Sequence, residues 1–236
     1  MSLRVLRDMF SLDTQKILVD STENHRRMTR FAEQYVHGAL GRIELFKGER
    51  PLFETHNVEQ EISRALQPRV NLNFGSYLII ESTEAMTTID VNTGGFVGAR
   101  NFDETIFRTN LEACHTIARE LRLRNLGGII IIDFIDMESE DEREALGRAL
   151  EEAMKDDKSR INILKISEFG LVQMTRKRLS ESITQAMCEP CCYCGGDGRL
   201  KSRRTIAHEI FRKISRDASK IGGTSLTIKV NPKVAD

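Results

Sequence analysis

A run of four isoleucines at residues 129–132 limits how this chain of 236 residues can fold more than any other feature. Two glycines precede the run, and Asp133 follows it directly. Continuous β-branched residues are typical of a strand in a covered, parallel-type sheet, so we expect this strand to be buried on both faces. A charge at the end of such a strand is costly to desolvate and needs a cation, an arginine or water as its partner. Asp133 is therefore a first candidate for chemistry.

A second apolar strand, at residues 87–92, also carries a carboxylate near its end. Asp90 and Asn92 lie two positions apart in it, so their side chains project from the same face. Ligands and metals gather at the carboxyl ends of strands in open α/β sheets. Mg²⁺ prefers oxygen ligands and is often held by one or two carboxylates, with water and phosphate completing its shell. On spacing alone a structural alternative stays open, in which Asp133 caps the following turn and Asp90 pairs with an arginine.

Patterns elsewhere predict an α/β protein whose core is a mixed sheet covered by helices. Strands are expected at 77–82 and 87–92, as an antiparallel hairpin, and at 162–166 and 171–175. A helix at 103–122 places Cys114 on its apolar stripe, where we expect an inert core thiol. A second helix begins at Ser139, which forms a capping box with Glu142, and Asp136 is expected to serve in capping that helix.

Two smaller parts flank this core. Residues 4–66 form a small α/β unit with strands at 16–19 and 42–46 and helices at 23–39 and 56–66, and residues 68–74 look like a boundary. Near the end of the chain, a basic helix at 204–219 and a strand at 225–230 form a small α/β element. That element is too small to hold a core alone, so it should lean on another element or another chain.

Four of the five cysteines crowd into residues 188–194, a spacing that indicates a metal site rather than a disulfide framework. Cys191 and Cys194 form a CxxC pair, in which both thiolates can face one tetrahedral zinc ion. The other ligands would come from Cys188, Cys192, a histidine or a second subunit. A redox pair is the competing interpretation, but redox CxxC motifs open a helix after a strand, whereas this one lies among proline and glycine. We therefore favour zinc.

The formal net charge is zero, but the charge is unevenly distributed. Residues 137–157 carry nine acidic and three basic side chains, whereas residues 158–220 carry fourteen basic and six acidic ones. A protein that binds a polyanion can show this pattern, and solvated surfaces explain it equally well. Arg176, Lys177 and Arg178 follow a predicted strand and are candidates to neutralise phosphates. With three tyrosines and no tryptophan, base stacking would fall mainly to phenylalanine or histidine.

The composition, 40% hydrophobic and 30% charged, is ordinary for a soluble globular protein. No apolar run approaches the roughly 18 residues of a membrane span, and no signal-peptide pattern opens the chain. We therefore expect a cytoplasmic protein with no membrane partner.

In combination, these motifs resemble those of the ribonuclease E/G family. The resemblance is carried by residues 75–81, 84–94, 121–137 and 174–178 and covers most of residues 4–236. It implies that Asp90 and Asp133 are magnesium ligands and that Asn92 orients one of them or the scissile phosphate. It also implies that Cys191 and Cys194 belong to a zinc link, in which two protomers of a homodimer share one zinc ion.

The resemblance further implies a domain organisation. Residues 4–66 would be an incomplete RNase H-like portion, 67–187 a DNase I-like catalytic subdomain, 188–202 the zinc link, and 203–236 a truncated dimerisation domain. The chain departs from the family pattern at Cys192, where a proline is usual, and at Cys188, an additional thiol.

The implied activity is magnesium-dependent cleavage of single-stranded RNA that leaves a 5′-phosphate, in maturation of ribosomal RNA and turnover of messenger RNA. We expect a fragment without the OB-fold RNA-binding domain and the 5′-phosphate sensor of the family. The alternative is a catalytically silent scaffold that dimerises through zinc.

Overall fold

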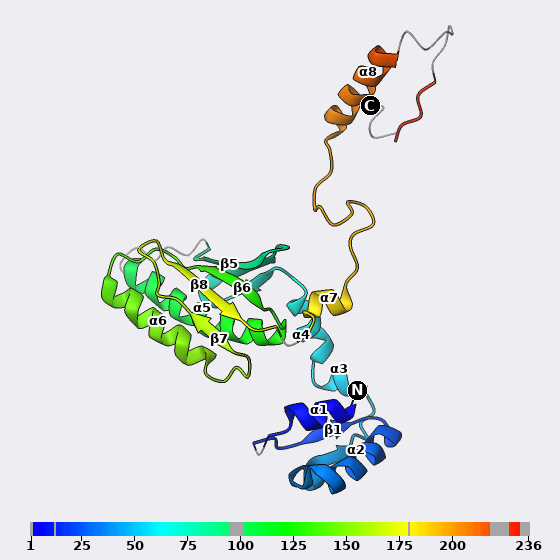
Figure 1. The fold of residues 1–236 in the computed structure, drawn as a ribbon, viewed down its shortest axis with the longest axis vertical. Coiled ribbons are helices and arrows are strands. Elements are labelled where there is room, and N and C mark those ends of the chain that lie inside the picture. The colour runs from blue at the N-terminus through cyan, green and yellow to red at the C-terminus, as the bar shows by residue number, and fades with distance from the viewer. Residues whose placement is uncertain (1, 12, 95–101, 179, 218–226, 232–236) are drawn as a thin grey trace. The chain divides into compact units, whose positions relative to one another are not determined.

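The computed structural model describes residues 2–11, 13–94, 102–178, 180–217 and 227–231 (Figure 1). The chain divides into two compact units, residues 1–186 and 187–236, and each is described by itself.

A six-stranded mixed sheet forms the centre of the first unit. Its strand order is β3-β4-β5-β6-β8-β7, and only β5 and β6 are parallel. The mixed sheet and the antiparallel hairpin are confirmed. The strand bounds are β3 Arg69–Asn71, β4 Tyr77–Ser82, β5 Met86–Asn92, β6 Gly128–Asp133, β7 Ile161–Ile163 and β8 Leu171–Arg176.

The expected boundary at residues 68–74 contains a short strand, β3, that belongs to the large sheet. Val70 pairs with Leu78 of β4, and the Ile80 amide donates to the Pro68 carbonyl at 2.8 Å. A three-residue strand is too short to show a clear alternating pattern, so its pairing with β4 determines it.

Two long helices, α5 (Phe102–Leu123) and α6 (Glu140–Met154), pack against one face of this sheet (Figure 1). Ser139 is the N-cap of α6, and its side chain accepts a hydrogen bond from the Glu142 amide at 3.4 Å. Cys114 of α5 is fully buried between sheet and helices, and burial raises the pKa of its thiol to about 12. The expectation of an inert core thiol is confirmed.

The opposite face of the sheet is open in the described chain. Ile130 and Ile132 are fully buried against the helices, whereas Ile129 is 41% exposed and Ile131 is half-buried. The expectation that the isoleucine run is buried on both faces was therefore wrong. The physical reason is that β6 pairs with an antiparallel strand on one side, and a sheet with antiparallel strands tolerates one solvated face.

A small α/β lobe precedes the large sheet. Strand β1 (Ile17–Val19) is parallel to β2 (Ile43–Leu45), and helices α1 (Ser2–Met9) and α2 (Thr22–Tyr35) pack around them. Its separate core consists of Leu6, Val19, Met28, Ala32, Ala39 and Ile43.

Several helices of this lobe differ from those expected. Helix α1 was not predicted, and α2 ends earlier than expected because a 3₁₀ helix, η1 (His37–Arg42), replaces its last turns. The expected helix at 56–66 is seen as α4 (Val58–Ala65), and a separate short helix that was not predicted, α3 (Leu52–Thr55), precedes it.

The end of the first unit is tied to the C-terminal end of α5. Helix α7 (Ile183–Met187), which was not predicted, begins where the Ile183 amide donates to the Arg124 carbonyl at 3.0 Å. Asn125 donates to the side chain of Ser180 at 2.7 Å. These bonds fix the chain that leads toward the cysteine segment.

The second unit contains helix α8 (Arg203–Asp217), close to the bounds expected for the basic helix. The expected strand at 225–230 is not seen at residues 227–230, and its first two residues and the expected end of the helix lie outside the described residues.

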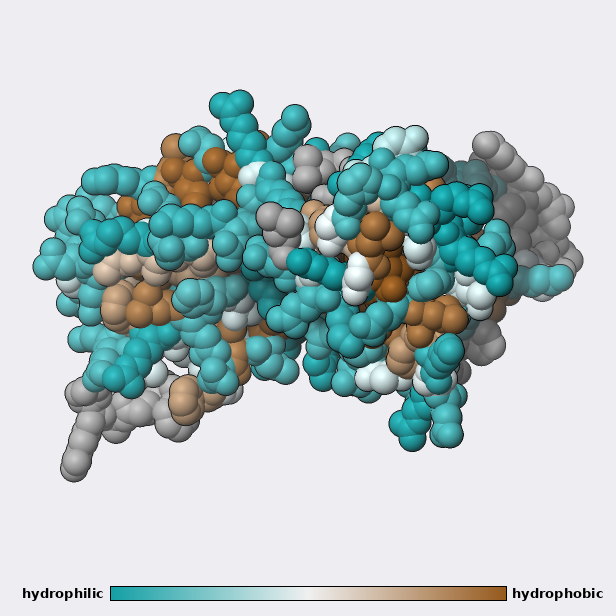
Figure 2. Space-filling model, turned by 90° about the horizontal axis from the view of Figure 1, so that it is seen from below, coloured by the Kyte–Doolittle hydropathy of each residue, from teal (hydrophilic) through white to brown (hydrophobic). Residues whose placement is uncertain are grey.

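On the surface drawn in Figure 2, hydrophobic residues occur in separate patches within a largely hydrophilic surface. Among the described helices, none has the length and apolar character needed to cross a membrane.

Candidate active site

Asp90 and Asp133 lie side by side at the carboxyl end of the parallel pair β5–β6. They are paired residues in the strand register, so their Cα atoms face one another across adjacent strands. Parallel strands end at the same edge of a sheet, and both side chains are exposed there. Asn92 follows in β5, and its amide donates to Asp90 Oδ2 at 2.7 Å. The structure thus brings together all three candidates from the two strands.

The electrostatics of this edge are those of crowded negative charge. Partial desolvation, together with the neighbouring carboxylates of Asp90 and Asp136, raises the pKa of Asp133 above its usual range. The expected capping role of Asp136 was wrong, because Ser139 is the N-cap of α6 and Asp136 is instead an exposed carboxylate beside Asp133. Its position three residues after a strand-end aspartate was the only sequence signal for this role.

Neither structural alternative for these carboxylates is seen among the described residues. No arginine or lysine in that part of the chain forms an ion pair with Asp90 or Asp133, and no backbone amide there donates to the Asp133 carboxylate. The described part of the chain also lacks any group of three or more histidine, cysteine, aspartate or glutamate side chains arranged to hold a metal ion. The cluster therefore offers two carboxylates and an amide, and water and substrate would have to supply the remaining ligands of a cation.

A buried asparagine holds the segment after Asp133 in place. Asn110 of α5 is fully buried, its Nδ2 donates to the Ile135 carbonyl at 2.8 Å, and its Oδ1 accepts from the Ile135 amide at 3.1 Å. These two bonds satisfy both backbone groups of one residue between Asp133 and Asp136. Sequence reasoning missed Asn110, and a polar residue on the apolar stripe of a helix was the available signal.

Two glycines allow close approach of the loops around this edge. Gly94, two residues after Asn92, has φ +66° and lies against the carbonyl of Gly75, where a Cβ atom would collide. Gly170 has φ +74°, and a Cβ on it would lie 2.7 Å from the Phe134 carbonyl oxygen. Both positions need the conformational freedom and small size of glycine.

The basic tract, residues 176–178, lies at one end of the sheet. The acidic edge, which Asp90 and Asp133 form, lies at the other end. In the pairing of β6 with β8, Arg176 faces Gly128, whereas Leu171 faces Asp133, five residues farther along β6. At roughly 3.3 Å per residue, this separation is about 17 Å. The structure therefore does not bring the tract and the acidic edge together.

Arg176 is not available to a phosphate in this structure. Its guanidinium donates to both carboxylate oxygens of Asp157 at 2.8 and 3.1 Å and to the Leu126 carbonyl at 2.6 Å. The side chains of Arg176 and Asp157 are 4% and 2% exposed. We therefore correct the expected phosphate-binding role of Arg176 to that of a buried ion pair. Lys177 and Arg178 are exposed, and Arg178 Nε donates to the Gly127 carbonyl at 2.9 Å.

The cysteine segment forms a tight turn in the second unit. The Gly195 amide donates to the Cys191 carbonyl at 2.8 Å, and the Gly198 amide donates to Cys194 Sγ at 3.3 Å. Hydrogen bonds from the backbone amides of Cys194 and Tyr193 and from the Cys194 side chain lower the pKa of the Cys191 thiol. Amides directed at sulfur favour the thiolate form, which is the form that binds metal. All four cysteines of this segment are free thiols.

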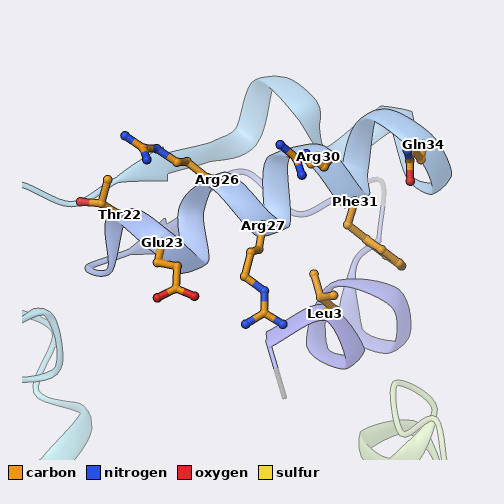
Figure 3. Close-up of a pocket in the computed structure, with 8 residues that line it drawn as sticks. All are labelled: Leu3, Thr22, Glu23, Arg26, Arg27, Arg30, Phe31 and Gln34. Atoms are coloured by element: carbon orange, nitrogen blue, oxygen red, sulfur yellow. The ribbon is translucent and has the colours of Figure 1, made fainter.

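A cavity of about 630 Å³ lies in the small N-terminal lobe. Figure 3 shows Arg27 and Phe31 of α2 pointing toward α1, where Leu3 lies. The lining of this cavity includes neither Asp90 nor Asp133. Its lining residues are Leu3, Thr22, Glu23, Arg26, Arg27, Arg30, Phe31 and Gln34.

Comparison with known proteins matches this chain to one family. The model of the ribonuclease E/G family matches residues 1–179. The chain belongs to the ribonuclease E/G family. Over 233 residues it is 46% identical to ribonuclease G of Salmonella typhimurium and to ribonuclease G of Escherichia coli, which covers 99% of this chain.

More distant members of the ribonuclease E/G family also match. Ribonuclease E of Escherichia coli is 40% identical over 224 residues, which is 92% of this chain and 21% of that protein. The chloroplastic ribonuclease E/G-like protein of Arabidopsis thaliana is 37% identical over 222 residues, which is 93% of this chain and 22% of that protein. The two ribonuclease G matches cover 48% of those proteins, so the chain spans about half their length.

Proposed function

We propose that this chain carries the catalytic site of a magnesium-dependent endoribonuclease that cuts single-stranded RNA. The observation that carries the proposal is the pairing of Asp90 and Asp133 at the carboxyl end of β5–β6, with the Asn92 amide on Asp90. Membership of the ribonuclease E/G family supports RNA as the substrate class.

The residues at the acidic edge fit a magnesium ion. The donors are all oxygen. Partial desolvation, together with the neighbouring carboxylates of Asp90 and Asp136, raises the pKa of Asp133, and a bound cation would relieve the repulsion between these carboxylates. Asp90 and Asp133 would hold the ion, and Asn92 would fix the orientation of the Asp90 carboxylate by donating to Oδ2. When bound, magnesium polarises a phosphodiester and lowers the pKa of an attacking water.

The assignment of parts follows the family. Residues 67–187 would be the DNase I-like catalytic subdomain and residues 4–66 a portion of the RNase H-like one. Cys191 and Cys194 would supply two ligands to a zinc ion shared with a second protomer, and the amide donors on their sulfurs support this role. Lys177 and Arg178 would contact phosphates away from the cut, beyond Arg176 and so more than about 17 Å along the sheet from Asp133. Processing of ribosomal RNA and turnover of messenger RNA would be the biological outcome.

The experiment compares Asp90→Asn and Asp133→Asn with the wild type in magnesium-dependent cleavage of an unstructured RNA oligonucleotide. Each carboxamide keeps the side-chain volume but removes the charge that binds the ion, so we expect cleavage to fall by at least about 100-fold with an unchanged unfolding midpoint. Asp156→Asn, at an exposed carboxylate two residues after the end of α6, is the matched control and should cleave normally.

Two outcomes oppose the proposal. Near-normal cleavage by either aspartate variant would remove the metal assignment. No cleavage by the wild type at any magnesium concentration, together with zinc-dependent dimerisation, would support the scaffold alternative instead.

A further inference from the structure

Two exposed phenylalanines lie in the loops at the acidic end of the sheet. Phe169 is 74% exposed and Phe74 is 82% exposed. Single apolar residues on a surface are ordinary. These two differ because each lies in a hydrogen-bonded loop directly before a strand that pairs with one of the acids. Phe169 precedes β8, which pairs with Asp133, and Phe74 precedes β4, which pairs with Asp90.

Phe169 is held at the tip of the loop that leads into β8. The Ser167 amide donates to the Leu171 carbonyl at 2.9 Å, and the Gly170 amide donates back to the Ser167 carbonyl at 3.1 Å. The Gly170 carbonyl accepts from the amide of Phe134, the residue after Asp133, at 3.2 Å. The backbone on which Phe169 is mounted is therefore bonded to the strand end that carries Asp133.

Phe74 is held in the turn between β3 and β4. Its φ of +55° is a left-handed conformation that is unfavourable for a bulky residue, and such strain persists where the surroundings or the function demand it. The turn is closed by the Leu72 amide, which donates to the Ser76 carbonyl at 2.8 Å. Tyr77, which follows the turn, pairs with Asn92 of β5.

The strand order places these loops on either side of the acids. Along this end of the sheet, the β3–β4 turn comes first, then the ends of β5 and β6, and then the start of β8. Neighbouring strands are about 4.8 Å apart, so the three intervals from β4 to β8 span roughly 14 Å. A short stretch of extended single strand can reach both rings while its backbone lies over the acids.

We propose that Phe169 and Phe74 stack on unpaired bases on the two sides of the phosphate that Asp90 and Asp133 attack. This inference rests on the proposed endoribonuclease function and names how the site grips its substrate. An aromatic ring stacks on any base, so the contact tolerates many sequences but requires bases that are not already paired and stacked in a duplex. The two rings thus select single-stranded RNA by its conformation and position it for the cut.

The test measures binding and cleavage separately. Binding is measured with a short single-stranded RNA made of 2′-O-methyl nucleotides, which is not expected to be cleaved, with 2-aminopurine as a stacking reporter. Phe169→Ala and Phe74→Ala should each weaken binding about tenfold and leave the 2-aminopurine fluorescence unquenched. Phe169→Tyr should restore both, because a phenol also stacks. Phe53→Ala, at an exposed phenylalanine of α3 in the small lobe, is the matched control and should bind normally.

Cleavage kinetics should show an effect on single-stranded RNA and none on duplex RNA. Phe169→Ala should raise KM for a single-stranded oligonucleotide and should not change the rate measured with a duplex of the same sequence. Unchanged affinity and unchanged quenching in both alanine variants would overturn the stacking proposal, even where Asp133→Asn is inactive. Normal cleavage by Asp133→Asn would instead overturn the proposed function, and the binding measurements would still decide whether the rings stack on RNA.

Discussion

Replacement of Arg176 by alanine is the change that best separates a structural role from an RNA-binding role in the basic tract. The guanidinium makes three hydrogen bonds, two to Asp157 and one to the Leu126 carbonyl, with both side chains of the ion pair almost fully buried. Removing the arginine leaves the Asp157 carboxylate buried and unpaired. Loss of one partner of a buried pair costs about 3–5 kcal/mol, a large part of the stability of a typical domain.

Urea unfolding followed by circular dichroism measures this loss. With a slope of ~2–3 kcal/mol per molar urea, the midpoint of Arg176→Ala should fall by roughly 1–2.5 M. Lys177→Ala, at the exposed neighbouring residue, should change stability by no more than about 0.5 kcal/mol. A midpoint shift below about 0.3 M for Arg176→Ala, with a clear loss of RNA affinity, would refute the structural assignment and restore the phosphate-binding one.

The same pair gives a pH dependence with a definite sign. Burial by itself raises the pKa of Asp157, but hydrogen bonds from Arg176 and the Ser159 amide outweigh it, so the pKa lies below its usual value of 3.8. The stability that comes from the pair is therefore present above about pH 4 and is lost as the pH falls through the lower folded-state pKa. The wild type should lose more stability than Asp157→Asn between pH 5 and pH 2, and parallel curves for the two proteins would contradict the lowered pKa.

Three further predictions concern the acidic edge and the cysteine turn. Asn110→Ala leaves both backbone groups of Ile135 without partners and should lower the free energy of unfolding by about 2–4 kcal/mol in urea unfolding, with a lower kcat in cleavage assays. Phe74→Asn should raise the free energy of unfolding by about 0.5–1 kcal/mol, because asparagine tolerates positive φ, while weakening binding of the 2′-O-methyl RNA. The double variant Cys191→Ser, Cys194→Ser should lose zinc by elemental analysis and sediment as a monomer, and unchanged zinc content and mass would exclude a shared site.

Local patterns predicted the parts of the fold that local forces determine. The β4–β5 hairpin and the Ser139 cap of α6 were predictable because a turn and a capping box each lie within a few residues. Pairing that depends on distant residues was not predictable. The Asp157 partner of Arg176 is 19 residues away, so a basic side chain after a strand looked exposed when it is buried. The isoleucine run was hydrophobic enough for two covered faces, and only the sheet topology shows that helices cover one.

The candidate acids could be predicted from the sequence, but the contacts that surround them could not. A carboxylate at the end of an apolar strand is visible in the sequence, whereas Asn110 and Phe169 gain their meaning from contacts made across the fold. Since the exposed basic residues Lys177 and Arg178 lie more than about 17 Å along the sheet from Asp133, one phosphate cannot touch both sites. An RNA strand that contacts both must cross the open face of the sheet. That face exposes Ile129 and Leu171, each 41% exposed, beside polar side chains of β8. This open face, which the isoleucine run did not predict, would provide such a path.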